Sequence, residues 1–360
     1  MTEFTPMPLP EIGVEQIALV ERLSNATAVS GDEGEVRKIV LEQVQPLADE
    51  CKVDALGNVL AVKKARVDNP LRVMLAAHMD EIGFMIVQDD DNGLFQFQLV
   101  GGIDIRQLPG KSVLVGKKHI PGVIGAKPIH LQESDETVRP IPLDTLRIDV
   151  GPENGKKVKP GDRATFATQF HQVGPSLVGK AMDDRLGVAI LIELLKHAPV
   201  NIEMLLAFTV QEEVGLRGAR VAGYAFNPDL AIVVDSTPAM DMPMWDDSEN
   251  TRYNTRLDAG PAIYIADSST LADPRLVNHL AKTGDQFGIP YQFRQPGGGG
   301  TDAGAIHTRR AGVPSISVSV PGRYAHTAVM MCRLNDWLHT LQLVHASMQM
   351  LTPALLAEPR

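Results

Sequence analysis

The stretch Thr209-Val210-Gln211-Glu212-Glu213-Val214-Gly215 decides how this 360-residue chain is interpreted. It follows the apolar run 204–208 (MLLAF), which is typical of a buried strand. Two adjacent carboxylates at a strand end are unusual, because carboxylates avoid burial unless they are paired or bind a metal. Neighbouring side chains point in different directions, so one could hold a cation while the other reaches a bound water. The alternative is a solvated Glu pair at the start of a helix, where acidic residues suit the helix dipole.

Strand-like and helix-like patterns alternate along most of the chain, which indicates an α/β fold. Helical spacing covers 14–25 and 33–49, and further buried strands are expected at 72–77, 230–234 and 314–320. Between about 83 and 172, short β-rich runs alternate with glycine instead, as in a small all-β domain. We therefore expect an α/β domain made of residues 1–82 and 173–360, with an inserted β domain at 83–172.

Metal-binding residue types lie just past the expected strands or open a helix. Function collects at the carboxyl ends of strands in an open α/β sheet. His, Asp and Glu are the ligands of catalytic zinc-type sites. Each residue taken alone has another explanation, as a structural histidine, a helix or turn cap, or a surface loop residue. Their joint placement favours a metal site, and the candidates are His78, Asp183, Glu213, Asp235 and His326.

The charges of this set suit two divalent cations. Asp183, Glu213 and Asp235 carry three negative charges, which two divalent cations and one hydroxide bring to zero while both histidines are neutral. A neutral buried cluster costs far less than an anionic one. Two metals about 3.5–4 Å apart can activate a water and polarise a carbonyl oxygen, so we expect a hydrolase of amides or esters. The absence of a Walker-type loop and of a Gly-x-Ser-x-Gly motif disfavours a nucleotide-binding protein and a serine hydrolase.

The composition argues against several other classes. A net charge of −10 without a Lys/Arg cluster disfavours a nucleic-acid partner. The two cysteines, Cys51 and Cys332, cannot form a disulfide framework and favour a reducing compartment. The N-terminus lacks signal-peptide character, and the longest apolar stretch, 188–195, is interrupted by Glu193 and too short to span a membrane. We therefore expect a cytoplasmic protein without a nucleic-acid or membrane partner.

Five ordered motifs stand out: 77–84 (AHMDEIGF), 179–185 (GKAMDDR), 211–215 (QEEVG), 299–303 (GGTDA) and 320–326 (VPGRYAH). Together they resemble those of the M42 family of metallo-aminopeptidases, the group of glutamyl and tetrahedral aminopeptidases. The resemblance extends over nearly the whole chain. The segment after 326, Thr327-Ala328-Val329, departs from it, since the family more often has Ser-Pro and then an acid there.

The resemblance implies a zinc-peptidase type of mixed sheet with helices on both faces, and two metal ions per chain, zinc or cobalt. His78 and Asp235 would hold one metal, Glu213 and His326 the other, and Asp183 would bridge the two. These assignments come from the family motifs and agree with the candidates found above.

The resemblance also implies roles beyond the ligands. Glu212 would be the general base, and Asp80 would orient the ring of His78, as metal-bound histidines usually require. The Asp183–Asp184 peptide bond would be cis. The β insertion would take part in oligomerisation and shape substrate access, because family members often assemble as dodecamers. The expected substrate is a short peptide with a free N-terminus.

Two other functions stay open on the sequence alone. One is a related dimetal hydrolase that acts on another amide, such as an acyl-amino acid or a peptide conjugate. The other is a metal- or peptide-binding protein without catalysis, which loss of a ligand or of the base would indicate. No ligand or base is lost here.

Overall fold

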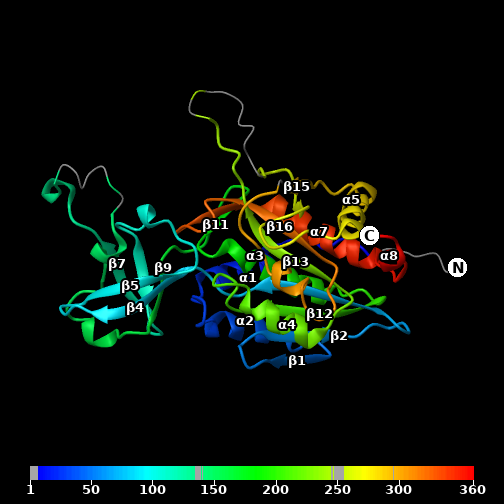
Figure 1. The fold of residues 1–360 in the computed structure, drawn as a ribbon, viewed down its shortest axis with the longest axis horizontal. Helices are drawn as coiled ribbons and strands as arrows, with labels where there is room; N and C mark the ends of the chain where they lie inside the picture. The colour runs from blue at the N-terminus through cyan, green and yellow to red at the C-terminus, as the bar shows by residue number, and fades with distance from the viewer. Residues whose placement is uncertain (1–6, 134–138, 140, 245, 247–254, 295) are drawn as a thin grey trace.

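In the computed structural model, which describes residues 7–133, 139, 141–244, 246, 255–294 and 296–360, a mixed sheet of eleven strands forms the larger region (Figure 1). Its central strands are parallel: β12 pairs with β3, β3 with β13, and β13 with β16. The strands that flank them pair antiparallel, as β1 does with β2, β2 with β12, and β17 with β16. In spatial order the main path is β1 (Glu50–Val53), β2 (Val59–Lys63), β12 (Ile202–Thr209), β3 (Leu71–His78), β13 (Leu230–Pro238), β16 (Ser315–Arg323), β17 (Met330–Arg333), β11 (Ser176–Gly179) and β10 (His171–Val173), with β14 (Ala262–Tyr264) and β15 (Gln292–Arg294) attached beside β16.

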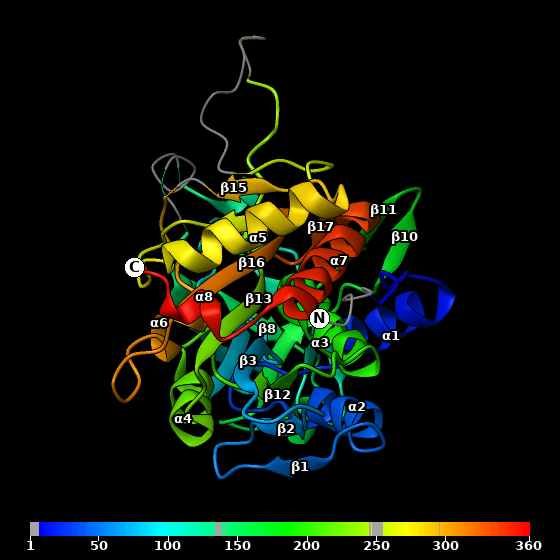
Figure 2. The ribbon, with the colours of Figure 1, turned by 90° about the vertical axis from the view of Figure 1, so that its right-hand side faces the viewer.

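Helices cover both faces of this sheet, as Figure 2 shows in a view along the layers. The strands are buried on both sides, so successive side chains enter different cores. Val73 and Leu75 of β3 pack in the core under α1, α2, α3 and α7, whereas Met74 and Ala76 pack against α4 and α6. The helices are α1 (Val14–Asn25), α2 (Gly34–Val44), α3 (Met182–Lys196), α4 (Arg217–Phe226), α5 (Pro274–Phe287), α6 (Ala303–Ile306), α7 (Leu334–Met350) and α8 (Ala354–Ala357).

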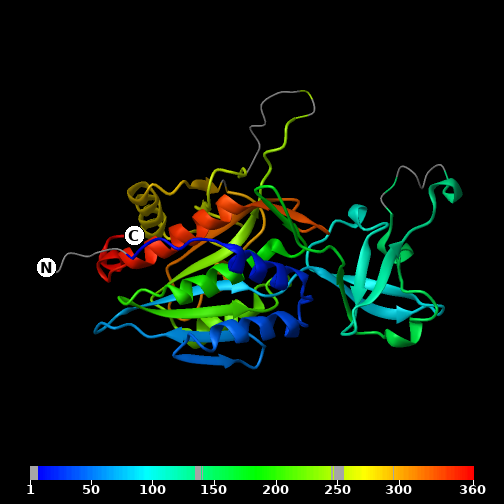
Figure 3. The same ribbon diagram turned by 180° about the vertical axis from the view of Figure 1, so that it is seen from behind.

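A closed antiparallel barrel projects from one end of the sheet region (Figures 1 and 3). Its core is separate from the two cores of the sheet and centres on Phe84, which contacts Phe97 and Phe166 edge to face at 5.2 Å between ring centroids. Around the barrel the strands are β4 (Gly83–Asp89), β5 (Leu94–Val100), β8 (Arg147–Asp149), β7 (Ile120–Gly125), β6 (Ser112–Val115) and β9 (Arg163–Phe166).

The predicted fold class is confirmed: a mixed α/β sheet with helices on both faces, and a small all-β unit. The barrel strands lie between Gly83 and Phe166, inside the predicted 83–172. β10, from His171, already belongs to the large sheet. The division into two domains at those boundaries remains our interpretation. Within the described residues, no helix has the length and apolar character needed to cross a bilayer.

Candidate active site

Parallel pairing places two of the predicted ligands side by side. His78 is the last residue of β3, and in the neighbouring strand β13 Val233 pairs with Ala76. Two residues further along both strands, Asp235 therefore comes level with His78. Both side chains are buried, and His78 Nε2 lies 3.8 Å from Asp235 Oδ1. On the other side of β3, Thr209 at the end of β12 pairs with His78, so Glu212 and Glu213 follow at the same edge of the sheet.

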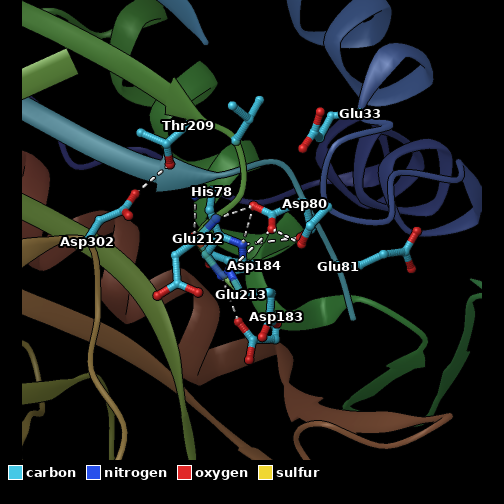
Figure 4. Close-up of polar contacts among 12 residues, drawn as sticks. Glu33, His78, Asp80, Glu81, Asp183, Asp184, Thr209, Glu212, Glu213 and Asp302 are labelled. Carbon is cyan, nitrogen blue, oxygen red and sulfur yellow. Dashed lines mark hydrogen bonds and ion pairs between the residues drawn. The ribbon is translucent and has the colours of Figure 1, made fainter. Parts of the chain in front are cut away.

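Asp183 lies within 3.5 Å of both predicted histidine ligands, and Figure 4 shows it below His78. His78 Nε2 is 3.1 Å from Asp183 Oδ1, and His326 Nε2 is 3.5 Å from Asp183 Oδ2. His326 Nε2 is also 3.5 Å from Glu213 Oε2. The structure thus brings all five predicted ligands into one cluster. The Asp183–Asp184 peptide bond is cis, which confirms the prediction.

The second ring nitrogen of each histidine is tied to a backbone carbonyl. His78 Nδ1 lies 3.2 Å from the carbonyl oxygen of Asp80, and His326 Nδ1 lies 2.9 Å from that of Gly102. A carbonyl oxygen only accepts, so each Nδ1 carries the proton and donates it. Each Nε2 faces Asp183 and would be the nitrogen that binds a metal, as in a metal-bound imidazole whose other nitrogen donates to a carbonyl.

Asp80 does more than the predicted orientation of His78. Its carboxylate accepts hydrogen bonds from the backbone N–H of Glu212 (2.9 Å) and of Glu213 (3.2 Å), and from the Ser30 hydroxyl (2.5 Å). The carboxylate itself is 3.6 Å from His78 Nδ1, further than its own backbone carbonyl. Asp80 therefore holds the Glu212–Glu213 turn against the end of β3.

Asp184 is a carboxylate that the sequence reasoning did not single out. It is fully buried and belongs, with His78 and Asp235, to one of three groups whose ligand atoms all lie within 4.8 Å of one another. Its oxygens accept from the backbone N–H groups of His78 (3.2 Å) and Gly187 (3.0 Å). Because both oxygens are engaged by the backbone, Asp184 ties the start of α3 to the end of β3. The only feature of the sequence that pointed to a role for Asp184 was its place directly after Asp183 in the motif.

The donor set fits divalent cations. Asp183, Glu213 and His326 form a second group with ligand atoms within 4.8 Å, and His78, Glu212 and Glu213 form the third. Carboxylate oxygens and neutral imidazole nitrogens are the donors that zinc-type metals take. His326, Glu213 and Asp183 are therefore close enough to share one ion, and His78 and Asp235 are close enough to share another together with Asp184.

The pKa values of three acids and one histidine in this cluster are raised. Burial raises the pKa of the Asp235 and Glu212 carboxyl groups well above their usual range and raises the pKa of Glu213 to about 7. The hydrogen bond with Asp183 raises the pKa of His326 to about 10. Crowded acids that resist ionisation beside a histidine that retains its proton indicate excess negative charge, which bound cations would neutralise.

A buried ion cluster lies beneath this site and also escaped the sequence reasoning. Glu81 accepts from Lys180 Nζ at 2.8 and 3.0 Å and from Arg185 Nη2 at 3.4 Å, and all three side chains are buried. The Thr165 hydroxyl of β9 donates to Glu81 at 3.0 Å. Glu81 belongs to the same motif as His78, and Lys180 and Arg185 belong to the same motif as Asp183. The sequence therefore shows where these charged residues stand, but not that they pair with one another.

Comparisons with known proteins agree with these features. The family model of M42 glutamyl aminopeptidases matches residues 57–343. The glutamyl aminopeptidase of Lactococcus lactis subsp. cremoris is 33% identical over 356 residues, which cover 94% of this chain and 97% of that protein. An aminopeptidase from the archaeon Desulfurococcus kamchatkensis has a similar structure, with a TM-score of 0.89 at 33% identity over 95% of this chain and 96% of that one. The TET1 peptidase of Pyrococcus horikoshii, which can assemble into a tetrahedron or a large octahedral shell, gives a TM-score of 0.80 at 33% identity over 92% of this chain and 98% of that one.

Proposed function

Because the chain belongs to the M42 family of peptidases and is an aminopeptidase, we propose that it uses two divalent cations, zinc or cobalt, to remove the N-terminal residue from short peptides. The observation that carries this proposal is the pair of Nε2 atoms that face the two oxygens of Asp183. His78 and Asp235 would hold one cation, His326 and Glu213 the other, and Asp183 both.

Bound cations of this kind polarise a carbonyl oxygen and lower the pKa of a water to about 7. The chain's own residues then orient the reactants and move the proton. Glu212 is suited to the base role because Asp80 fixes its backbone at 2.9 Å while its side chain lines the cavity beside His78 and Asp235. It would take the proton of the attacking water and pass it to the leaving amine.

We further propose that the chain forms a homo-oligomer, for example a dodecamer. The barrel region 83–172 would contribute to assembly and would shape the access of substrate to the active site. Similarity to a peptidase that assembles into shells supports this. In such an assembly, inward-facing sites would admit short peptides and exclude folded proteins. Light scattering under assay conditions measures the assembly, and an active monomer would contradict it.

The test of the proposed function combines metal analysis with a substrate screen. Protein purified without chelator should contain close to two divalent ions per chain, and it should hydrolyse aminoacyl p-nitroanilides after loading with zinc, cobalt or manganese. Blocking the α-amino group of the substrate should abolish hydrolysis. Activity in protein whose metal content stays near zero after loading would overturn the proposal.

A further inference from the structure

The loop of residues 210–218, which carries the Glu212–Glu213 pair, runs from the end of β12 into the first turn of α4. It contains two strained positions. Gln211 has a φ of 55° and Leu216 a φ of 56°, so a residue with a side chain occupies the left-handed region on each side of the Glu pair. A residue other than glycine keeps such a conformation only where its surroundings enforce it. The contacts that enforce this loop therefore bear on where the Glu pair points.

The two ends of this loop meet at Val210 and Gly218, where the Gly218 N–H donates to the Val210 carbonyl at 2.9 Å. Asn58, which stands directly before β2 and is fully buried, bonds both of these residues as well. The Val210 N–H donates to Asn58 Oδ1 at 3.0 Å, and Asn58 Nδ2 donates to the Gly218 carbonyl at 3.1 Å. A Cβ at position 218 would lie 2.3 Å from Asn58 Oδ1, so this close contact requires the glycine.

The side-chain amide of Asn58 is fixed in one orientation. Its Nδ2 also donates to Asp54 Oδ2 at 2.7 Å, so both protons of Nδ2 face acceptors. Asp54 Oδ1 in turn accepts from the backbone N–H groups of residues 56–58 at 2.9, 2.9 and 3.0 Å. A carboxylate of the same shape as Asn58 could accept from Val210, but it could not donate to Gly218.

We propose that Asn58 is a positioning residue for the reaction: by bonding both ends of the 210–218 loop, it holds the strained turn in the conformation that directs Glu212 toward the candidate metal ligands. Asn58 is not among the residues that line the cavity beside His78 and Asp235, so it acts through the backbone of the loop and not on the substrate. The inference rests on the proposed function, because it takes Glu212 as the base.

A purely structural role for Asn58 is the alternative, because the same bonds tie the turn between β1 and β2 to the start of α4. That role predicts a less stable protein whose folded fraction keeps its kcat. A positioning role predicts a lower kcat at nearly unchanged KM, since a displaced base slows the chemical step without weakening the binding of substrate.

The experiment measures hydrolysis of an aminoacyl p-nitroanilide by wild type and Asn58→Asp at saturating metal. The substitution keeps the shape of the side chain and the bond from Val210, but it turns a carboxylate oxygen toward the Gly218 carbonyl and Asp54. We expect kcat to fall about 10- to 100-fold while KM changes little. Near-wild-type kcat in correctly folded Asn58→Asp would overturn the inference.

The matched control is Asn201→Asp. Asn201 Nδ2 donates to the Leu351 carbonyl at 3.0 Å, so the same substitution again turns a carboxylate oxygen toward a carbonyl. Asn201 stands directly before the first residue of β12, whereas Glu212 follows the last one, so the two lie at opposite ends of this strand. Asn201→Asp should keep the wild-type kcat, and an equal fall of kcat in both variants would also overturn the inference.

A milder variant covers the case in which Asn58→Asp does not fold. Asp54→Asn removes only the acceptor of one Nδ2 proton and adds no charge beside the loop. Its kcat should fall several-fold at nearly unchanged KM, and an unchanged kcat in this variant would count against the role of Asn58.

Hydrogen exchange followed by mass spectrometry separates this inference from the proposed function. The backbone N–H groups of residues 210–218 should exchange faster in Asn58→Asp than in wild type, and at the wild-type rate in Asn201→Asp. If no aminoacyl substrate is hydrolysed but this acceleration appears, the proposed function fails and the role of Asn58 in holding the loop stands. If hydrolysis occurs while Asn58→Asp changes neither kcat nor the exchange of the loop, the role of Asn58 is wrong.

Discussion

The large sheet and the barrel serve the candidate active site in different ways. The sheet region carries all five candidate ligands and Glu212, most of them where a strand ends or a helix begins. The barrel side provides the Gly102 carbonyl to His326 and the Thr165 hydroxyl to Glu81. The sheet region therefore holds the reactive groups, whereas the barrel donates to or accepts from two side chains of the sheet region, His326 and Glu81. Each of the following predictions removes one contribution of one region.

The largest effect is expected on the sheet side, at Glu212. Glu212→Gln keeps the shape of the side chain and removes the proton acceptor, so kcat should fall about 10²–10⁴-fold, or ~3–5 kcal/mol in barrier. Its metal content should stay unchanged, whereas Glu213→Gln should lose metal. Steady-state kinetics and metal analysis of both variants provide the check. Near-wild-type kcat in Glu212→Gln with both metals bound would refute the base assignment.

The ion cluster where the two regions meet should show a large effect on stability. Glu81→Gln leaves Lys180 and Arg185 buried without an anion, and breaking a buried pair in this way costs about 3–5 kcal/mol. Urea denaturation measures the free energy of unfolding. Glu42→Gln is the control, since its pair with Arg22 is about half exposed and should contribute less than about 1 kcal/mol. Equal losses in both variants would show that burial of the cluster does not matter.

The barrel loop should influence the site through one histidine. A Cβ at Gly102 would lie 3.3 Å from His326 Nδ1, so Gly102→Ala should displace the ring from its carbonyl partner. Loss of such a supporting contact typically lowers metal affinity about 10- to 100-fold. Competition with a chromophoric chelator measures this affinity. Gly125→Ala, also in the barrel, is the control, because the nearest atom to its Cβ is 3.9 Å away. Identical affinities in the two variants would exclude an orienting role for Gly102.

The smallest effect is expected where the surfaces of the two regions touch. Glu35 Oε1 of α2 lies 2.6 Å from Nε2 of His119, which belongs to the turn between β6 and β7 of the barrel. The two side chains are 34% and 40% exposed. Burial acts to raise the pKa of Glu35, but bonds from Thr27 and His119 together hold it below its usual value. The unfolded chain then binds the proton more readily, so this stabilisation is present above the usual pKa and is lost as pH falls through the lower folded value.

Glu35→Gln should therefore cost no more than about 1 kcal/mol near neutral pH. The difference in Tm between wild type and Glu35→Gln should shrink between about pH 7 and about pH 3. Thermal unfolding followed by circular dichroism at both pH values gives this difference. A gap that widens on acidification would mean that the pKa of Glu35 is raised rather than lowered in the folded protein.

The sequence by itself determined the class of fold and the positions of the candidate ligands. Apolar runs such as 72–77 and 204–208 report buried strands, because a strand buried on both faces is apolar throughout. His78 and Glu213 were found because they stand just past such runs. The ordered motifs added the family and the cis bond at Asp183. All of these features are local, so a short window of sequence contains them.

Only the tertiary structure decided which groups support those ligands. Gly102 and His326 are separated by 224 positions, and Glu81 and Lys180 by 99. Hydrophobic periodicity states which face of an element is buried, but not which distant residue that face meets. Those long-range contacts depend on the strand order, on the strand register and on where the barrel packs against the sheet. These features are set only when the whole chain folds.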